Sequence, residues 1–177
     1  GRAYWRKGRP AEALRYYGEA LAVSRAAGHL EVEIVALNLS GTVHLFSGRP
    51  RTAVDWYERA LTLAREAGDR ESVHRAVHGR GNARQALGML DDALADHTQV
   101  LAYCRASGRD FGETASLLNL AEIEVDAGRP RPALVHADEA LRRGREIGDV
   151  RAQARALEYL PRVGALLNPD VEHILRL

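Results

Sequence analysis

The sequence predicts an all-α protein in which helix pairs of similar length stack against one another. Its glycines recur every 40 residues, at positions 8, 48, 88 and 128 and again at 28, 68, 108 and 148. Roughly 17 residues lie between successive turns, which is the length of one helix of about 25 Å. Apolar residues make up 46% of the chain and aromatic residues only 6%, so small aliphatic side chains must build the core. This composition favours closely packed helices over sheets.

The first kind of helix junction is a Gly-Arg-Pro hinge. Gly48 follows an apolar stretch, where the end of a helix favours a left-handed residue. Pro50 suits the first turn of the next helix, because its missing N–H would have no partner there. The same hinge recurs at 8–10 and 128–130.

The second kind of junction combines a glycine stop with an N-cap. Glycine followed by aspartate at 68–69 and 148–149 predicts the end of one helix and the capped start of the next. At the third repeat, Asp110 and Glu113 have the spacing of a capping box.

The helix that follows each hinge has one apolar face. In the second repeat this stripe is formed by Ala53, Val54, Tyr57, Ala60 and Leu61. The stretches 48–69 and 128–149 agree at 11 of 22 positions, which confirms the register. A single helix pair cannot bury both of its faces, so the repeats are expected to stack as one solenoid. The expected repeats are 1–28, 29–68, 69–108, 109–148 and a partial repeat 149–177.

The last segment departs from the pattern. Pro161 interrupts the helix expected over 149–167, and we expect a kink or an early end there. Residues 168–170 are expected to start a short helix or tail. The chain enters the repeat pattern at Gly1, and we expect it to be a fragment of a longer protein.

Charge and composition argue against several function classes. The net charge is +1, with 25 basic and 24 acidic residues, so the basic surplus typical of nucleic-acid binding is missing. The single Cys104 excludes an intramolecular disulfide, and we expect it to be a small packing residue. Lys7 is the only lysine, which we attribute to a GC-rich genome. No apolar run is long enough to span a membrane, and a cytoplasmic location is expected.

These repeats resemble the tetratricopeptide repeat (TPR) family. The resemblance rests on a small residue in the first helix (Gly41, Gly81, Ala121), on the turn glycines, and on the pattern Ala53–Tyr57–Ala60–Leu61. It implies helix–turn–helix repeats stacked into a right-handed superhelical solenoid. The family usually repeats every 34 residues, whereas this chain repeats every 40. This longer variety is similar to the repeats that follow ATPase modules in large bacterial transcriptional regulators.

The resemblance also implies where a partner would bind, because ligands of this family usually lie on the concave face formed by the first helices. The expected groove residues are Asn38, Thr42, Arg75, His78, Asn82, Gln85, Asn119, Glu122, Arg155 and Tyr159. Asparagine can both donate to and accept from a peptide backbone, and arginine matches a carboxylate. The groove is therefore expected to hold an extended acidic segment, although an ordinary solvated face fits the same residues. The lysines of the family's carboxylate clamp are missing here.

Other candidate sites are weaker. His74 and His78 are spaced as zinc ligands can be, but no third ligand is indicated, so a surface pair is the expected arrangement. No phosphate loop or catalytic set is recognisable, and neither an enzymatic activity, nor a cofactor, nor a metal is expected.

Two functions follow from these observations. The first is a scaffold or sensor module of a bacterial regulator that binds a peptide, a protein or neighbouring domains of its own chain. The second is an effector-sensing domain of a transcriptional regulator that binds a small molecule. Direct binding to nucleic acid or to a membrane is not expected, and self-association through the terminal helices stays open.

Overall fold

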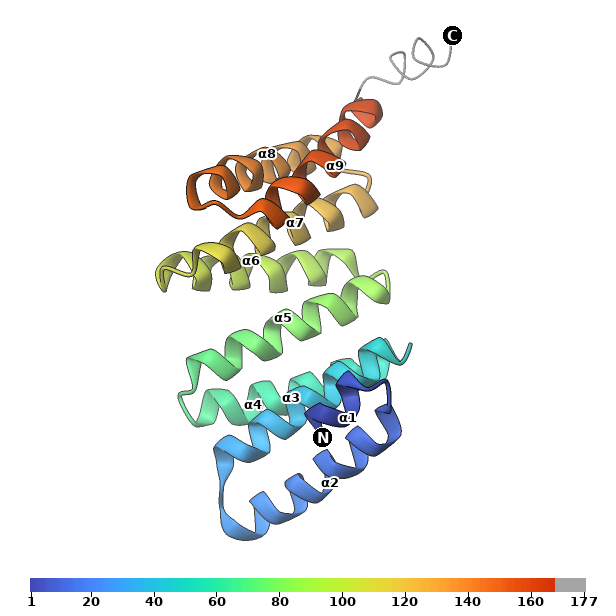
Figure 1. Cartoon of the computed structure of the whole chain (residues 1–177), viewed down its shortest axis with the longest axis vertical. Coiled ribbons are helices and arrows are strands. Elements are labelled where there is room, and N and C mark those ends of the chain that lie inside the picture. Colours follow the sequence, from blue (N-terminus) through green and yellow to red (C-terminus); the bar gives the residue numbers. More distant parts are fainter. Residues whose placement is uncertain (168–177) are drawn as a thin grey trace. The chain divides into compact units, whose positions relative to one another are not determined.

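The computed structural model describes residues 1–167, and every regular element in this part of the chain is a helix (Figure 1). The helices are α1 (Arg2–Arg6), α2 (Pro10–Ala27), α3 (Leu30–Phe46), α4 (Pro50–Glu66), α5 (Arg70–Ala86), α6 (Leu90–Ala106), α7 (Asp110–Asp126), α8 (Pro130–Ile147) and α9 (Val150–Leu167). The predicted all-α class is confirmed. None of these helices is long and apolar enough to cross a membrane.

The chain forms two compact units, residues 1–96 and 97–177, and α6 contains the boundary between them. In the first unit each helix from α1 to α4 packs against the next one, and α3 also contacts α5. In the second unit α7, α8 and α9 pack in the same way, with α7 also contacting α9. Small and aliphatic side chains fill both cores, as the composition predicts. Fully buried examples are Ala13, Ile34, Leu37, Leu61, Leu117 and Leu120.

The helix junctions form as the repeat predicts. All eight turn glycines have a positive φ, between 64° and 73°, a conformation that residues other than glycine rarely adopt. Pro10, Pro50 and Pro130 occupy the first position of their helices. Asp69 accepts a hydrogen bond from the backbone N–H of Ser72, and Asp149 accepts one from Ala152, so both predicted N-caps are confirmed.

The predicted capping box at Asp110 is wrong. The residue in the N-cap position of α7 is Arg109, which makes no side-chain cap, and Asp110 is the first residue of the helix. The 40-residue period explains the shift, because Arg109 rather than Asp110 is equivalent to Asp69. Glu113 bonds to two arginines in place of the helix terminus.

The early end expected at Pro161 is also wrong, because α9 continues through it to Leu167. Pro161 lies on the exposed side of α9, where water can bond to the Leu157 carbonyl that lost its helical partner. Ala156 and Val163 are buried on either side of the proline and hold both halves of the helix against the unit. The helix or tail expected from 168–170 lies outside the described residues.

A buried carboxylate joins α5 to α6 within the first unit. The side chain of Asp96 is only 4% exposed and accepts hydrogen bonds from Arg80 Nε at 3.0 Å, Arg80 Nη2 at 2.7 Å and Arg84 Nη1 at 2.8 Å. Both arginines are largely buried as well, with side-chain exposures of 13% and 17%. The two cations and the anion satisfy one another inside the unit.

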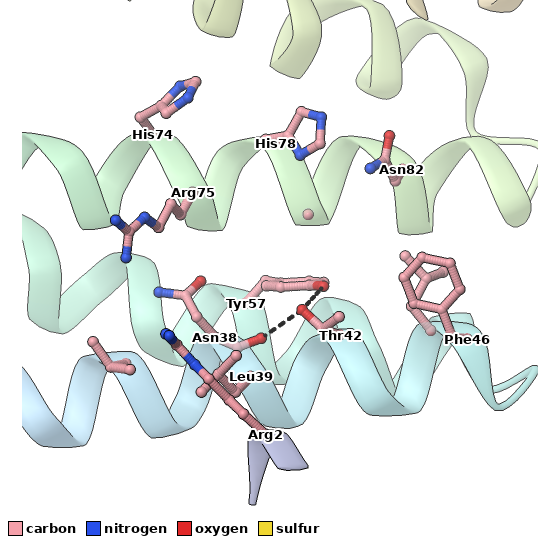
Figure 2. A pocket seen from close by; sticks show the side chains of 13 residues that line it. Arg2, Asn38, Leu39, Thr42, Phe46, Tyr57, His74, Arg75, His78 and Asn82 are labelled. Carbon is pink, nitrogen blue, oxygen red and sulfur yellow. Dashed lines mark hydrogen bonds between the residues drawn. The ribbon is translucent and has the colours of Figure 1, made fainter. Parts of the chain in front are cut away.

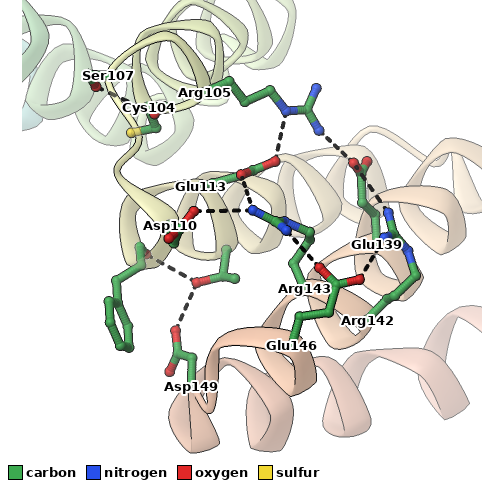
Figure 3. A network of polar contacts seen from close by, with 12 residues as sticks. Cys104, Arg105, Ser107, Asp110, Glu113, Glu139, Arg142, Arg143, Glu146 and Asp149 are labelled. Atoms are coloured by element: carbon green, nitrogen blue, oxygen red, sulfur yellow. Dashed lines mark hydrogen bonds and ion pairs between the residues drawn. The ribbon is translucent and has the colours of Figure 1, made fainter.

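A closed ring of ion pairs joins α6, α7 and α8 in the second unit (Figure 3). Arg105 binds Glu113 at 2.9 Å and Glu139 at 2.6 Å. Arg143 binds Glu113 at 3.2 Å and Glu146 at 2.6 Å. Arg142 closes the ring through Glu146 at 3.0 Å and Glu139 at 4.0 Å. Opposite charges alternate around the ring, so each group has two partners.

Glu113 is expected to make the stability of the second unit depend on pH. Burial acts to raise its pKa, but the hydrogen bonds from Arg105 and Arg143 outweigh burial and leave the pKa below the ordinary 4.5. A carboxyl with a lowered folded-state pKa stabilises the fold above the unfolded value, and this contribution is lost as the pH falls through the folded value. The melting temperature of the wild type should therefore fall below about pH 4.5.

The matched variant is Glu113→Gln, which cannot titrate. It should melt at a lower temperature than the wild type at pH 7, and the difference should shrink toward pH 3. Thermal denaturation followed by circular dichroism at both pH values measures this. A constant difference between the two proteins would contradict the assignment.

The thiol of Cys104 is buried in the second unit, where its residue is 1% exposed. A Cβ placed on Gly112 would lie 2.8 Å from the sulfur, so only glycine allows α7 to pass this close to the thiol. The packing role predicted for Cys104 agrees with this position.

Candidate functional site

A pocket of about 470 Å³ lies between α3 and α5 in the first unit (Figure 2). Helix α3 supplies Val35, Asn38, Leu39, Thr42, Leu45 and Phe46, and α5 supplies His74, Arg75, His78, Gly79 and Asn82. Arg2 of α1 and Tyr57 of α4 complete the lining. These residues come from the helix faces that the period brings together, so the pocket is a direct product of the repeat.

Tyr57 separates α3 from α5 and shapes the inner wall of the pocket. Its ring lies against two glycines: a Cβ on Gly41 would be 2.8 Å from the ring, and one on Gly79 would be 2.3 Å from it. The hydroxyl groups of Tyr57 and Thr42 are 3.1 Å apart. Because Thr42 donates its hydrogen to the Asn38 carbonyl, the Tyr57 hydroxyl is the donor to Thr42. Burial raises the pKa of Tyr57 despite this hydrogen bond.

Asn38 contributes a buried acceptor to the pocket. The residue is 8% exposed, and its Nδ2 donates to the Ile34 carbonyl at 3.3 Å. Its Oδ1 is buried and accepts no hydrogen bond from the described residues. In Figure 2 the amide of Asn38 extends from α3 toward α5. An unsatisfied buried acceptor costs about 1–3 kcal/mol, which a ligand N–H would recover.

The charged groups around the pocket are cationic. Arg2 and Arg75 line it, and none of the described lining residues is acidic. Glu71 fixes Arg75 through its Nε at 3.1 Å, yet the arginine side chain is still 51% exposed. Burial, followed by the neighbouring His74, lowers the pKa of His78, so His78 is uncharged at neutral pH. The pocket therefore offers positive charge at Arg2 and Arg75 and neutral polar groups elsewhere.

The structure brings half of the predicted groove residues together. Asn38, Thr42, Arg75, His78 and Asn82 all line this pocket. Gln85 lies on α5 three residues beyond Asn82 but does not line it. The other predicted residues, Asn119 and Glu122 on α7 and Arg155 and Tyr159 on α9, belong to the second unit.

In the second unit, Arg155 and Glu122 form an ion pair across α9 and α7 at 3.4 Å. Burial and the charge of Glu122 raise the pKa of the nearby Tyr159. A second pocket, of about 360 Å³, lies beside this group between α7 and α9. Its lining consists of Phe111, Ala115, Leu118, Asp149, Arg151, Ala152 and Arg155.

Sequence reasoning missed several lining residues of the first pocket. Val35 and Phe46 lie three residues before Asn38 and four residues after Thr42, so helical spacing could have identified them. Phe46 is the most conspicuous, because it is 72% exposed and packs its ring 5.8 Å from that of Trp5. His74 lines the pocket rather than an open surface. Among the described residues, no group of three or more His, Cys, Asp or Glu side chains could hold a metal ion.

Comparison with known proteins agrees with this architecture. Residues 1–66 match the tetratricopeptide repeat family. No curated protein sequence matches the chain. Among solved structures, the TPR domain of Arabidopsis FLU is 24% identical, with a TM-score of 0.61, over 64% of this chain and 96% of that domain.

Two further structures cover more of the chain. One is a single-residue variant of the nearly identical TPR-like repeats of a putative kinesin light chain from Podospora anserina. It is 16% identical with a TM-score of 0.81, over 99% of this chain and 87% of that one. BtubC from P. vanneervenii is 18% identical with a TM-score of 0.66, over 90% of this chain and 65% of that one. The chain thus has the helix-pair fold of tetratricopeptide repeat proteins, and its first 66 residues match the family itself.

Proposed function

We propose that this chain is a protein- or peptide-binding module of a larger bacterial regulatory protein, and that its first helices hold an extended acidic segment. TPR repeats generally mediate protein–protein interaction, and this supports the class of function. The regulatory context and a cytoplasmic location rest on the resemblance of the 40-residue repeats. The predicted groove residues of both units belong to this proposal.

The observation that carries the proposal is the combination of Asn38 with the cations of the first pocket. The buried Oδ1 of Asn38 lacks a donor, and a peptide backbone supplies N–H donors at regular intervals. Arg2 and Arg75 lie in the same pocket, where a carboxylate can pair with a guanidinium. An acidic peptide provides both kinds of group in one ligand.

The experiment starts with a library of random dodecapeptides displayed on phage, selected against the chain. We expect Asp and Glu to be enriched in the recovered peptides. A synthetic copy of the best peptide should bind Asn38→Leu about tenfold more weakly than the wild type in fluorescence anisotropy, because one hydrogen bond is worth roughly 1.4 kcal/mol. Leu118 occupies the equivalent position one pair of repeats later, so the fold accommodates leucine there.

Gln99→Leu is the matched control, since it removes an exposed amide on α6 outside the pocket. Its affinity should equal that of the wild type. Selection of neutral or basic peptides, or equal affinity of the wild type and Asn38→Leu, would contradict the proposal.

The size of the first pocket supports a second candidate function, the sensing of a small effector. A volume of about 470 Å³ lies within the range of small-molecule sites, roughly 300–1,000 Å³. The same lining selects a small organic anion with an N–H donor. A rise in melting temperature with such anions, together with an empty peptide selection, would favour this function over peptide binding.

A further inference from the structure

The two pockets occupy equivalent positions in the repeat, one in each compact unit. Three lining positions coincide after a shift of 80 residues, or two repeats. These pairs are Val35 with Ala115, Asn38 with Leu118, and Arg75 with Arg155. In each unit the pocket lies between helices two elements apart, α3 and α5 or α7 and α9, which contact each other.

One of these positions alternates in character along the chain. The first helices carry Val35, Arg75, Ala115 and Arg155 at this place, so the residue repeats every 80 rather than every 40. Packing alone requires only the 40-residue period, which the turn glycines follow. The alternation gives each pocket one small apolar wall and one arginine wall.

The arginine recurs although its surroundings have changed. Of the 17 residues of α5, only Arg75 and Ala76 are identical at the equivalent positions of α9. Ala76 and Ala156 are completely buried, and the core explains their identity. Arg75 and Arg155 are half-exposed, with side-chain exposures of 51% and 38%, so packing does not explain theirs.

Each arginine is also held in place by a carboxylate of its own unit. Glu71 accepts from Arg75 Nε at 3.1 Å, and Glu122 accepts from Arg155 Nη2 at 3.4 Å. A guanidinium has five N–H donors, so one such contact leaves others for a ligand. Pre-positioning a side chain lowers the entropy that it loses on binding.

We propose that the α3/α5 pocket and the α7/α9 pocket are two equivalent subsites, each of which binds one acidic side chain. The carboxylate pairs with Arg75 or Arg155, and the methylene groups of the side chain lie against Val35 or Ala115. This inference rests on the proposed function and adds to it a repetition in the ligand: a segment with acidic residues for both units, or two copies of one acidic segment.

The two subsites differ in strength. Asp149 lines the second pocket, where its two oxygens accept from Thr114 and from the backbone of Ala152. Its charge opposes an incoming carboxylate, and the first pocket has no such group among its described lining residues. The α3/α5 subsite therefore binds an acidic side chain more tightly than the α7/α9 subsite.

The test uses the whole chain labelled with ¹⁵N and a minimal probe, acetyl-Ala-Glu-Ala-amide, in a titration followed by heteronuclear correlation spectra. Backbone amides of Gly79 and Asn82 report on the first pocket, and those of Ala115 and Ala152 on the second. We expect saturable shifts in both groups, and about tenfold weaker binding of acetyl-Ala-Gln-Ala-amide at each.

Three variants separate the subsites. Arg75→Gln should weaken probe binding about tenfold at the first pocket alone, and Arg155→Gln should do the same at the second alone. Asp149→Asn should strengthen binding at the second pocket, because asparagine caps a helix as well as aspartate does while removing the charge.

Each other outcome overturns a defined part of the inference. Shifts at the first pocket only would contradict the second subsite and leave the proposed function standing. Shifts at neither pocket would contradict both the subsites and an acidic ligand. Equal responses to inorganic phosphate and to the glutamate probe would show general anion sites instead of acidic side-chain sites.

Discussion

Replacing Asp96 with asparagine is expected to lower the free energy of unfolding by about 3–5 kcal/mol, because it leaves two buried guanidinium groups without their anion. Asp96 is the hydrogen-bonded partner of both Arg80 and Arg84, and none of the three side chains is more than 17% exposed. The nearest other carboxylate, Glu58, lies 3.7–3.8 Å from these arginines and is half-exposed, so it replaces little of the lost interaction. Urea denaturation followed by circular dichroism measures the change.

Asp55→Asn is the control for this variant. Asp55 is exposed on α4, and the same substitution there should change the free energy of unfolding by no more than about 0.5 kcal/mol. If Asp96→Asn were as stable as the control, the buried ion pair would not be holding α5 against the start of α6.

The second large effect is expected for Gly79→Ala. The new Cβ would lie 2.3 Å from the ring of Tyr57, which is already enclosed by Gly41 on its other side and held by its hydroxyl at Thr42. Because the ring has nowhere to move, α3, α4 and α5 must separate, and we expect a loss of about 1–3 kcal/mol or more. The same variant should weaken binding of the selected peptide, since Gly79 lines the first pocket.

Gly18→Ala makes the opposite prediction from the same substitution. Gly18 is exposed within α2, and a Cβ there meets no atom within 4 Å. Alanine should stabilise that helix by roughly 0.5–1 kcal/mol. Thermal melts of the two variants side by side test the packing at Tyr57, and similar melting temperatures would contradict it.

The regular part of this fold could be read from the sequence because a few residues determine each junction. A glycine with positive φ, a proline in the first turn and an aspartate cap act locally, so their spacing predicts the helices. The errors came from places where tertiary contacts compete with local rules. Glu113 has the spacing of a capping box but bonds to Arg105 and Arg143, which lie on other helices.

The candidate site was predicted in part for a similar reason. Helical spacing placed Asn38, Thr42, Arg75 and Asn82 on the correct faces, but it gave no information about how deep each face lies. The buried acceptor of Asn38 and the wall formed by Tyr57 depend on how closely α3, α4 and α5 approach. No pairwise spacing within one helix contains that distance.

Asp96 shows what an internal comparison could still have revealed. The equivalent residues of the other repeats are Tyr16, Trp56 and His136, so a carboxylate stands where rings are usual. Arg80 and Arg84 lie 16 and 12 residues before it in the sequence, on the neighbouring helix. A charged residue at a ring position, with two cations on the preceding helix, is the signature of a buried ion pair.

The buried thiol of Cys104 also gives the molecule an internal reporter of its own opening. Alkylating reagents need the thiolate and direct access to sulfur, so they react only with molecules in which α6 and α7 have separated. In a repeat protein, neighbouring helix pairs can open at different free energies. The rate of alkylation along a urea titration would follow the second unit alone, while circular dichroism follows all helices. The difference between the two curves would measure how strongly the units cooperate, without any engineered label.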